Sequence, residues 1–147
     1  KLLRKMIETI HILSHNQPNI FEKIKIIDKV PLDELVYWTS GASIGVIPYE
    51  NNCLNHWFCS PNKLWEYPYA KVPIIASPFP EISKIIDLYK IGWFLPDPLT
   101  PKGIANIVNE LTDDDLKEKK IGCTNFIKSD NWDSSEVELN KIYGMMV

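Results

Sequence analysis

Arginine is almost missing from this 147-residue chain, because Arg4 is the only one among its 16 basic residues, which face 19 acidic ones. The positive charges form no cluster and the formal net charge is -3, which excludes the basic footprint of a nucleic-acid-binding protein. Long hydrophobic runs are also lacking: residues 72–76 are typical, whereas a membrane span needs about 20 apolar residues. The three cysteines are an odd number without framework spacing, which favours a reducing, cytoplasmic compartment.

The residues that are present have the balance of a globular protein, 45% hydrophobic and 24% charged. A chain of this length can bury about two-thirds of its unfolded surface, so its core needs neither disulfides nor metal. We therefore predict a single, partial domain over residues 1–147. Apolar residues already have helical spacing at the start of the chain, from Lys1, so we expect this chain to be a piece of a longer protein. We also expect it to carry no signal peptide.

Short apolar, β-branched runs alternate with segments of helical spacing along the chain. Strands are predicted at residues 25–27, 43–48, 73–76 and 92–95. Helices are predicted over 1–14 and from Pro31, Ser60-Pro61, Ser77-Pro78-Phe79-Pro80, Thr100-Pro101, Thr112 and Ser134, the last covering 134–147. The inner faces of the later helices are predicted to include Ile104, Ile107, Val108, Val137 and Ile142. This alternation indicates an α/β fold, a Rossmann-like parallel sheet with helices on both faces.

Ligands of an open parallel sheet lie beyond the carboxyl ends of its strands, where loops lead into helix N-termini. Three loops meet this description, at residues 28–31, 49–60 and 77–80. The middle loop is the longest and leads into the Ser60-Pro61 helix start, which combines a capping serine with proline at the first helical position. This loop is therefore the leading candidate for a binding site.

The residues after Ser60 have the chemistry of an anion site. Pro61 has no N–H, so the free N–H groups of Asn62 and Lys63, the helix dipole and the Lys63 ammonium would face an anion together. Glu66 follows one turn after Asn62, on the same face as Lys63, and is placed to accept two hydrogen bonds from a ribose diol. The alternative is that Ser60 only caps its own helix, while Lys63 and Glu66 are ordinary surface charges.

The run Ser60–Tyr67 (Ser-Pro-Asn-Lys-Leu-Trp-Glu-Tyr) and the strand Val72–Ser77 resemble the donor-site segment of group 1 (family 4) glycosyltransferases of the GT-B fold. In that family a Ser-Pro-x-Lys-x-x-Glu-Tyr run precedes a Gly-x-Pro-Val-Ile strand. Further similarities lie in the turn Lys29–Leu35, the strand Ala42–Pro48, and the closing order of Gly92, Pro96-Asp97-Pro98, Asn131-Trp132 and Tyr143. The resemblance covers about residues 24–143 and is specific in Ser60–Tyr67.

The resemblance implies the C-terminal, donor-binding half of a retaining glycosyltransferase that makes polysaccharide or glycoconjugate at the cytoplasmic face of a membrane. Its donor is a nucleotide-diphospho-sugar, and no metal or other cofactor is implied. Glu66 would hold the ribose hydroxyls, Ser60, Asn62 and Lys63 would meet the diphosphate, and the main chain of Val30 would meet the nucleobase. The full implied set of donor-binding residues is Val30, Phe58, Cys59, Ser60, Pro61, Asn62, Lys63 and Glu66, and none of them is catalytic.

The sequence departs from the family pattern in three respects. Many relatives carry a first glutamate, which contacts the sugar, where Phe58 stands; Asn55, His56 or main-chain groups would have to replace it. Lys71 stands where relatives favour glycine. The first strands of the family's domain, and the whole acceptor domain before them, have no counterpart in this sequence. We therefore expect an inactive chain whose uncovered sheet edge and apolar helix faces favour self-association.

Metal sites are the competing interpretation of several residues. Cys53, His56 and Cys59 have zinc-like spacing, but structural zinc usually takes four ligands. His11 and His15 lie one helical turn apart, and Asp113–Asp115 fit either a divalent ion or a helix start, so spacing alone leaves the choice open.

The competing function is a non-catalytic regulatory module of receiver-like α/β type. Such a module would need acidic residues clustered at the strand ends, and Asp28 alone does not meet that need.

Among the five tryptophans, Trp57 is the one expected to contact a ligand, because it lies in the donor-side loop.

Overall fold

The computed structural model describes residue 27 and residues 29–144, and the chain divides into two compact units, residues 1–31 and 32–147. The predicted helix over residues 1–14, residues 25 and 26 of the first predicted strand, and Asp28 lie outside the described residues. Ile27 is described and is not in a strand. All the described helices and strands belong to the second unit.

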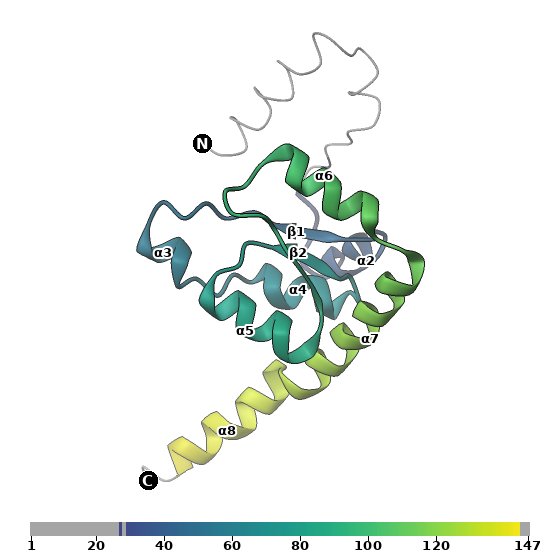
Figure 1. Ribbon diagram of the computed structural model, residues 1–147. Helices are drawn as coiled ribbons and strands as arrows, with labels where there is room; N and C mark the ends of the chain where they lie inside the picture. The colour runs from purple at the N-terminus through teal and green to yellow at the C-terminus, as the bar shows by residue number, and fades with distance from the viewer. Residues whose placement is uncertain (1–26, 28, 145–147) are drawn as a thin grey trace. The chain divides into compact units, whose positions relative to one another are not determined.

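A parallel sheet of three short strands forms the centre of this unit (Figure 1). Strands β1 (Gly45–Ile47), β2 (Ile74–Ala76) and β3 (Gly92–Phe94) lie side by side in sequence order, with Val46 beside Ile75 and Ile75 beside Trp93. These strands confirm the predictions at 43–48, 73–76 and 92–95. The fold is therefore α/β with a parallel sheet, which is compatible with a Rossmann-like domain.

Helices α4 (Lys63–Tyr69) and α5 (Pro80–Tyr89) connect these strands, and α7 (Asp113–Ser129) packs against both of them. Leu64, Ile82 and Phe126, one from each helix, are completely buried. The centre of the Phe126 ring lies 4.9 Å from the centre of the Tyr89 ring and 6.1 Å from that of the Trp65 ring. The core thus joins the sheet to three helices, and α2 (Leu35–Ser40) packs outside it against α4.

Two helix starts occur where their capping residues predict them. Thr100 caps α6 (Pro101–Glu110) by accepting a hydrogen bond from the N–H of Gly103. Thr112 and Asp115 form a reciprocal capping box at the start of α7. Hydrogen bonds from Thr112 lower the pKa of Asp115, so this cap stabilises the fold at neutral pH and loses that contribution as pH falls through the lowered pKa.

Three helix starts differ from the prediction. Helix α2 begins at Leu35 rather than Pro31, because residues 32–34 form a turn. Helix α4 begins at Lys63, so Ser60 is not its N-cap: Asn62 holds that position in helical backbone, after a tight turn in which Leu64 N–H donates to Pro61 O. The last helix, α8 (Trp132–Gly144), begins two residues before Ser134, since the Asn131 side chain accepts from Ser134 N–H.

The predicted loop 49–60 contains a single helical turn, α3 (Leu54–Trp57), which sequence periodicity did not indicate. The centre of its Trp57 ring lies 5.3 Å from the centre of the Phe79 ring. This tryptophan, predicted to contact a ligand, therefore contributes to the packing around the core.

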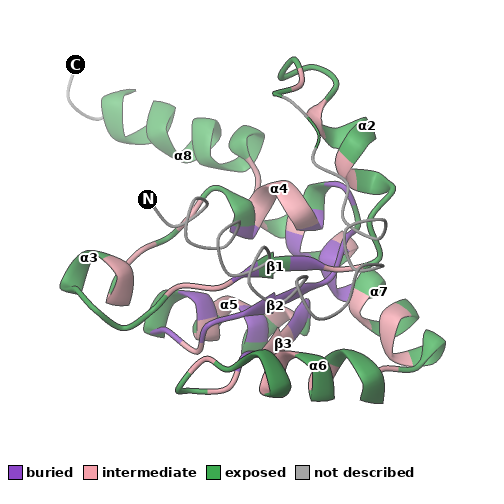
Figure 2. Cartoon of the chain, turned by 90° about the horizontal axis from the view of Figure 1, so that it is seen from above, coloured by how far each residue is buried: buried purple, intermediate pink, exposed green. Residues whose placement is uncertain are grey.

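Two predicted inner faces are not buried. Every residue of α8 is exposed, including Val137 and Ile142, and α6 has no buried residue although Ile104 and Ile107 are partly covered (Figure 2). The side chain of Val46 in β1 is also 41% exposed. Self-association through these faces stays a prediction.

Among the described residues, no helix combines the length and apolar character needed to cross a bilayer.

The turn between α4 and β2 places Lys71 in left-handed backbone, with φ of 58°. Its N–H donates to Pro68 O, and the N–H of Val72 donates to Tyr67 O, which closes the end of the helix. Glycine is the residue that adopts this conformation without steric cost. This is the position at which the resembling family favours glycine.

Lys71→Gly is expected to raise the free energy of unfolding by about 0.5–1 kcal/mol. Glycine avoids the left-handed penalty of roughly 1–2 kcal/mol, and part of the gain is lost to the greater entropy of the unfolded chain. Urea unfolding measures the change. Lys84→Gly, inside α5, is the control and should lower the same quantity by about 1 kcal/mol. If both variants lowered the free energy of unfolding by the same amount, the backbone at Lys71 would not be left-handed.

Candidate functional site

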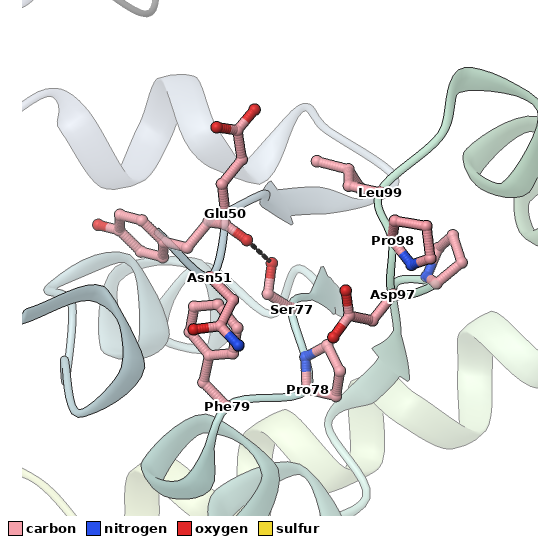
Figure 3. A pocket seen from close by; sticks show the side chains of 10 residues that line it. Glu50, Asn51, Ser77, Pro78, Phe79, Asp97, Pro98 and Leu99 are labelled. Atoms are coloured by element: carbon pink, nitrogen blue, oxygen red, sulfur yellow. Dashed lines mark hydrogen bonds between the residues drawn. The ribbon is translucent and has the colours of Figure 1, made fainter. Parts of the chain in front are cut away.

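Loops from all three strands meet at the carboxyl edge of the sheet and line a cavity of about 240 Å³ that is open to solvent (Figure 3). It is lined by residues 49–51 after β1, residues 77–79 after β2, and residues 96–99 after β3. The first two loops were predicted from the sequence as ligand-binding loops. The third was missed, and the signal that could have identified it is the run Pro96-Asp97-Pro98 directly after a strand.

Ser77 joins two of these loops. Its side chain is 3% exposed, and its hydroxyl donates to the carbonyl oxygen of Tyr49 at 2.6 Å. Its N–H donates to Ile47 O at 3.1 Å, which extends the pairing of β1 with β2 by one residue. The serine therefore holds the start of the first loop against the start of the second.

Lys63 and Glu66 lie on the same face of α4, as their spacing predicts, and they form an ion pair with each other, which the sequence analysis did not predict. Their side chains are 47% and 30% exposed, so both remain accessible from solvent. The Lys63 ammonium also lies 6.0 Å from the centre of the Tyr67 ring. An ammonium and a carboxylate are thus side by side at the start of the helix that follows the long loop.

Glu66 also lines a second hollow, a groove of about 210 Å³ between helices α2 and α4. The other lining residues are mostly apolar: Leu35, Val36 and Thr39 from α2, with Trp65 and Tyr69 from α4. The indole N–H of Trp65 donates to a carboxylate oxygen of Asp130 at 3.3 Å, which fixes one wall of this groove to the end of α7.

The other predicted donor-binding residues line neither hollow. Ser60 and Asn62 are exposed, Pro61 is half-buried, and Phe58 is 61% exposed. Cys59 packs against the hydrophobic core. Val30 belongs to the first unit, so its contact with a nucleobase stays a prediction. The structure therefore brings together Lys63 and Glu66, while residues 58–62 line neither hollow.

Among residues 27 and 29–144, no three His, Cys, Asp or Glu side chains gather into a group that could hold a metal ion, so Cys53, His56 and Cys59 do not converge. His56 instead has Nδ1 3.1 Å from the carbonyl oxygen of Glu50. Burial raises the pKa of the Cys59 thiol, which opposes the thiolate form that binds zinc. His11 and His15 lie outside the described residues.

Comparison of the chain with protein-family models, with curated proteins and with solved structures gives no match.

The three thiols are expected to react with iodoacetamide in the order Cys53, Cys59, Cys123. Cys53 is exposed, Cys59 is partly buried, and burial raises the pKa of Cys123 to about 12 at 0% exposure. Because the thiolate is the reacting form, Cys123 should resist labelling at pH 8 until urea unfolds the chain. Peptide mass spectrometry over time gives the order. Labelling of Cys123 as fast as Cys53 would contradict the packing of α7.

Proposed function

We propose that this chain is the nucleotide-sugar-binding domain of a group 1 glycosyltransferase of the GT-B fold. The observation that carries the proposal is the accessible Lys63–Glu66 pair in the first turn of α4, at the edge of the groove between α2 and α4. The pair supplies one cation for a diphosphate and one carboxylate for a ribose diol within a single helical turn. The parallel sheet that positions α4 is the architecture that such a domain requires.

The ion pair is compatible with ligand binding because an exposed pair is easily exchanged. Surface pairs of this kind contribute about 0–1 kcal/mol, so Lys63 can turn to a phosphate oxygen at little cost. Glu66 then accepts from the two ribose hydroxyls, and these charge-assisted bonds replace the one it gives up. In the free protein the pair keeps both side chains near the positions at which they act.

The groove beside Glu66 suits the remainder of a nucleoside. A ribose held by Glu66 directs its base along the groove, whose walls include the aromatic side chains of Trp65 and Tyr69. A flat base buries apolar surface there, and the Trp65–Asp130 hydrogen bond keeps one wall in place. The donor thus spans from the phosphates at Lys63, through the ribose at Glu66, to the base between α2 and α4.

The backbone at Lys71 is a second, independent support for the family resemblance. The family favours glycine at this point, and the chain adopts the left-handed conformation that explains such a preference. The same tight turn precedes a fully buried strand, β2. A lysine there is tolerated at a conformational cost, so the departure concerns stability rather than the site.

The sugar would be recognised differently from many relatives. Phe58 stands at the place of the sugar-binding glutamate, and it is exposed and cannot accept a hydrogen bond. Of the substitutes considered, His56 is tied by Nδ1 to the carbonyl of Glu50, whereas Asn55 is exposed. Asn55 and the main chain of this loop are therefore the better candidates for contacts with the sugar.

The receiver-like alternative is not favoured, although two carboxylates do lie at the carboxyl edge. Glu50 follows β1 and Asp97 follows β3, so the central strand separates them. Their carboxylates point in different directions, that of Asp97 toward Ser77 and that of Glu50 away from it (Figure 3). Carboxylates that diverge in this way do not share one Mg²⁺ ion, which a receiver uses to accept phosphate.

Lys63→Ala and Glu66→Ala are each expected to weaken binding of a nucleoside diphosphate sugar about tenfold to a hundredfold, since a hydrogen bond to a charged group contributes roughly 1.5–3 kcal/mol. Calorimetry with uridine and guanosine diphosphate sugars measures both. The loss from Lys63→Ala should shrink at high salt, because it is a charge contact with phosphate. The loss from Glu66→Ala should be nearly independent of salt and vanish for a donor that lacks ribose hydroxyls.

The matched control is the Lys141–Glu138 pair of α8, which has the same spacing and is exposed. Lys141→Ala and Glu138→Ala should leave donor binding unchanged, and all four variants should unfold within about 1 kcal/mol of the parent chain. Unchanged binding in both α4 variants, or the same salt dependence for both, would show that the assigned roles are wrong.

The 147-residue chain is expected to bind donor without transferring sugar. In a GT-B enzyme the reaction takes place between two domains, and the second unit described here supplies the sheet and helices of one. Without a facing wall, the acceptor is not oriented and water is not excluded from the reacting centre. An assay of transfer to simple acceptors tests this. Transfer at the rate of an intact glycosyltransferase would refute the assignment of this chain to the donor side alone.

A further inference from the structure

The single turn α3 is anchored to the protein along one side. Trp57 and Cys59 pack against the hydrophobic core, and the Trp57 ring lies against that of Phe79. Between these contacts and the loop, Nδ1 of His56 lies 3.1 Å from the carbonyl oxygen of Glu50. These contacts fix the inner side of the turn, so its outer side is held in a defined position before any ligand arrives.

The outer side of α3 presents two large apolar side chains to solvent. Leu54 is 76% exposed and Phe58 is 61% exposed. Phe58 N–H donates to Leu54 O at 3.0 Å, and side chains four positions apart along such a turn are neighbours. Exposed Asn55, three positions before Phe58, adjoins it in the same way. The turn lies toward one side of the unit in both views (Figures 1 and 2), so this outer face is accessible.

The whole segment around α3 is free of charged side chains. Residues 51–62 contain no Asp, Glu, Lys or Arg, although 24% of the chain is charged. Its polar groups beside the apolar pair are neutral amides, which both donate and accept hydrogen bonds. The face therefore suits a ligand that has an apolar part together with a neutral hydrogen-bonding group.

The small size of the apolar face decides what it can bind. A stable interface between two protein copies buries roughly 1,200–2,000 Å², whereas an aromatic side chain buries only about 150–250 Å². Peripheral binding to a bilayer draws on basic side chains, and residues 51–62 have none. A pair such as Leu54 and Phe58 is instead large enough to cover one aliphatic or aromatic group of a small molecule.

We propose that Leu54 and Phe58 bind the apolar part of the acceptor, which makes the acceptor an alcohol whose hydroxyl is borne by an aliphatic or aromatic group. This rests on the proposed function, in which the donor sugar contacts Asn55 and the main chain of this loop. Because Asn55 adjoins Phe58, a molecule seated on the apolar pair has its hydroxyl beside the sugar. Phe58 thus selects the acceptor at a position where many relatives contact the sugar.

The first test is titration of the isotope-labelled 147-residue chain with 1-butanol, 1-pentanol, 1-hexanol and benzyl alcohol, followed by amide resonances in two-dimensional NMR. The alcohols are expected to shift the amides of Leu54, Asn55 and Phe58 with a Kd of millimolar order, as expected for ligands of so few atoms. Each added CH₂ should tighten binding about twofold to fourfold, because it adds buried apolar surface. Glycerol, which lacks an apolar part, should cause no shift.

Leu54→Asn and Phe58→Asn should each weaken binding of 1-hexanol at least threefold, and the double variant should remove it. Both side chains are exposed, so the midpoint of urea unfolding should stay unchanged. The matched controls are Leu88→Asn in α5 and Ile121→Asn in α7, where the apolar side chains are 67% and 63% exposed. Neither control should alter the binding of 1-hexanol.

The second test locates the bound alcohol relative to the donor. The probe is 4-hydroxy-TEMPO, a neutral alcohol on an apolar ring with a nitroxide radical that broadens nearby resonances. With bound uridine or guanosine diphosphate glucose, it should broaden the anomeric proton of the sugar more than the protons of the base. The Leu54→Asn/Phe58→Asn double variant, which keeps the donor site, should lose this difference.

The outcomes separate this inference from the proposed function. Donor binding without alcohol shifts at α3, equal losses in the Leu88 and Ile121 controls, or stronger broadening of the base than of the sugar would overturn the inference alone. Alcohol binding without any donor binding would refute the proposed function and, with it, the acceptor assignment. Lys63→Ala should weaken donor binding and leave 1-hexanol binding intact.

Two further results would assign α3 to another occupant and so overturn the inference. One is co-sedimentation with vesicles of phosphatidylglycerol and phosphatidylethanolamine that Phe58→Asn abolishes, which would identify a bilayer contact. The other is a dimer in analytical ultracentrifugation that the same variant dissociates, which would identify a second copy of the chain.

Discussion

The complete burial of β2 is the constraint on which the described unit depends. Ile74, Ile75 and Ala76 have 0% exposure, and hydrogen bonds hold this strand to β1 on one edge and to β3 on the other. Both of its ends are fixed by local devices: the left-handed turn at Lys71 before it and the Ser77 hydrogen bonds after it. Helix α4, the cavity at the carboxyl edge and the groove between α2 and α4 are all positioned relative to this strand.

The surface around the sheet divides into two regions of opposite character. The start of α4 presents an ammonium beside a carboxylate and opens onto an apolar groove, while the carboxyl edge presents acceptors and rings. These charges distinguish the two regions, because an anion is attracted to the Lys63 ammonium and repelled by the carboxylates of Glu50 and Asp97.

Sequence reasoning worked best where short-range rules apply. The three described strands lie within their predicted ranges, Thr100 and Thr112 cap the helices predicted for them, and Lys63 and Glu66 share one face of α4. It failed at Ser60, since a serine before proline has the composition of a cap, yet the chain makes a tight turn through Pro61 before the helix begins. The loop after β3 was missed as a wall of the cavity, because nothing in its local pattern shows which other loops it will face.

The sequence by itself determined the type and order of most of the described elements, with α3 as an exception, because periodicity, capping and turn formation are decided within a few residues of chain. It also placed Lys63 and Glu66 on one face of a helical turn, and the structure shows that the two form an ion pair. Tertiary structure decided which apolar faces are covered: Ile82 and Phe126 are buried, while Val137 and Ile142, on an equally apolar pattern, are exposed. It also decided which loops share a cavity. Burial and convergence depend on segments far apart in the chain, and periodicity within one segment carries no information about its neighbours in space.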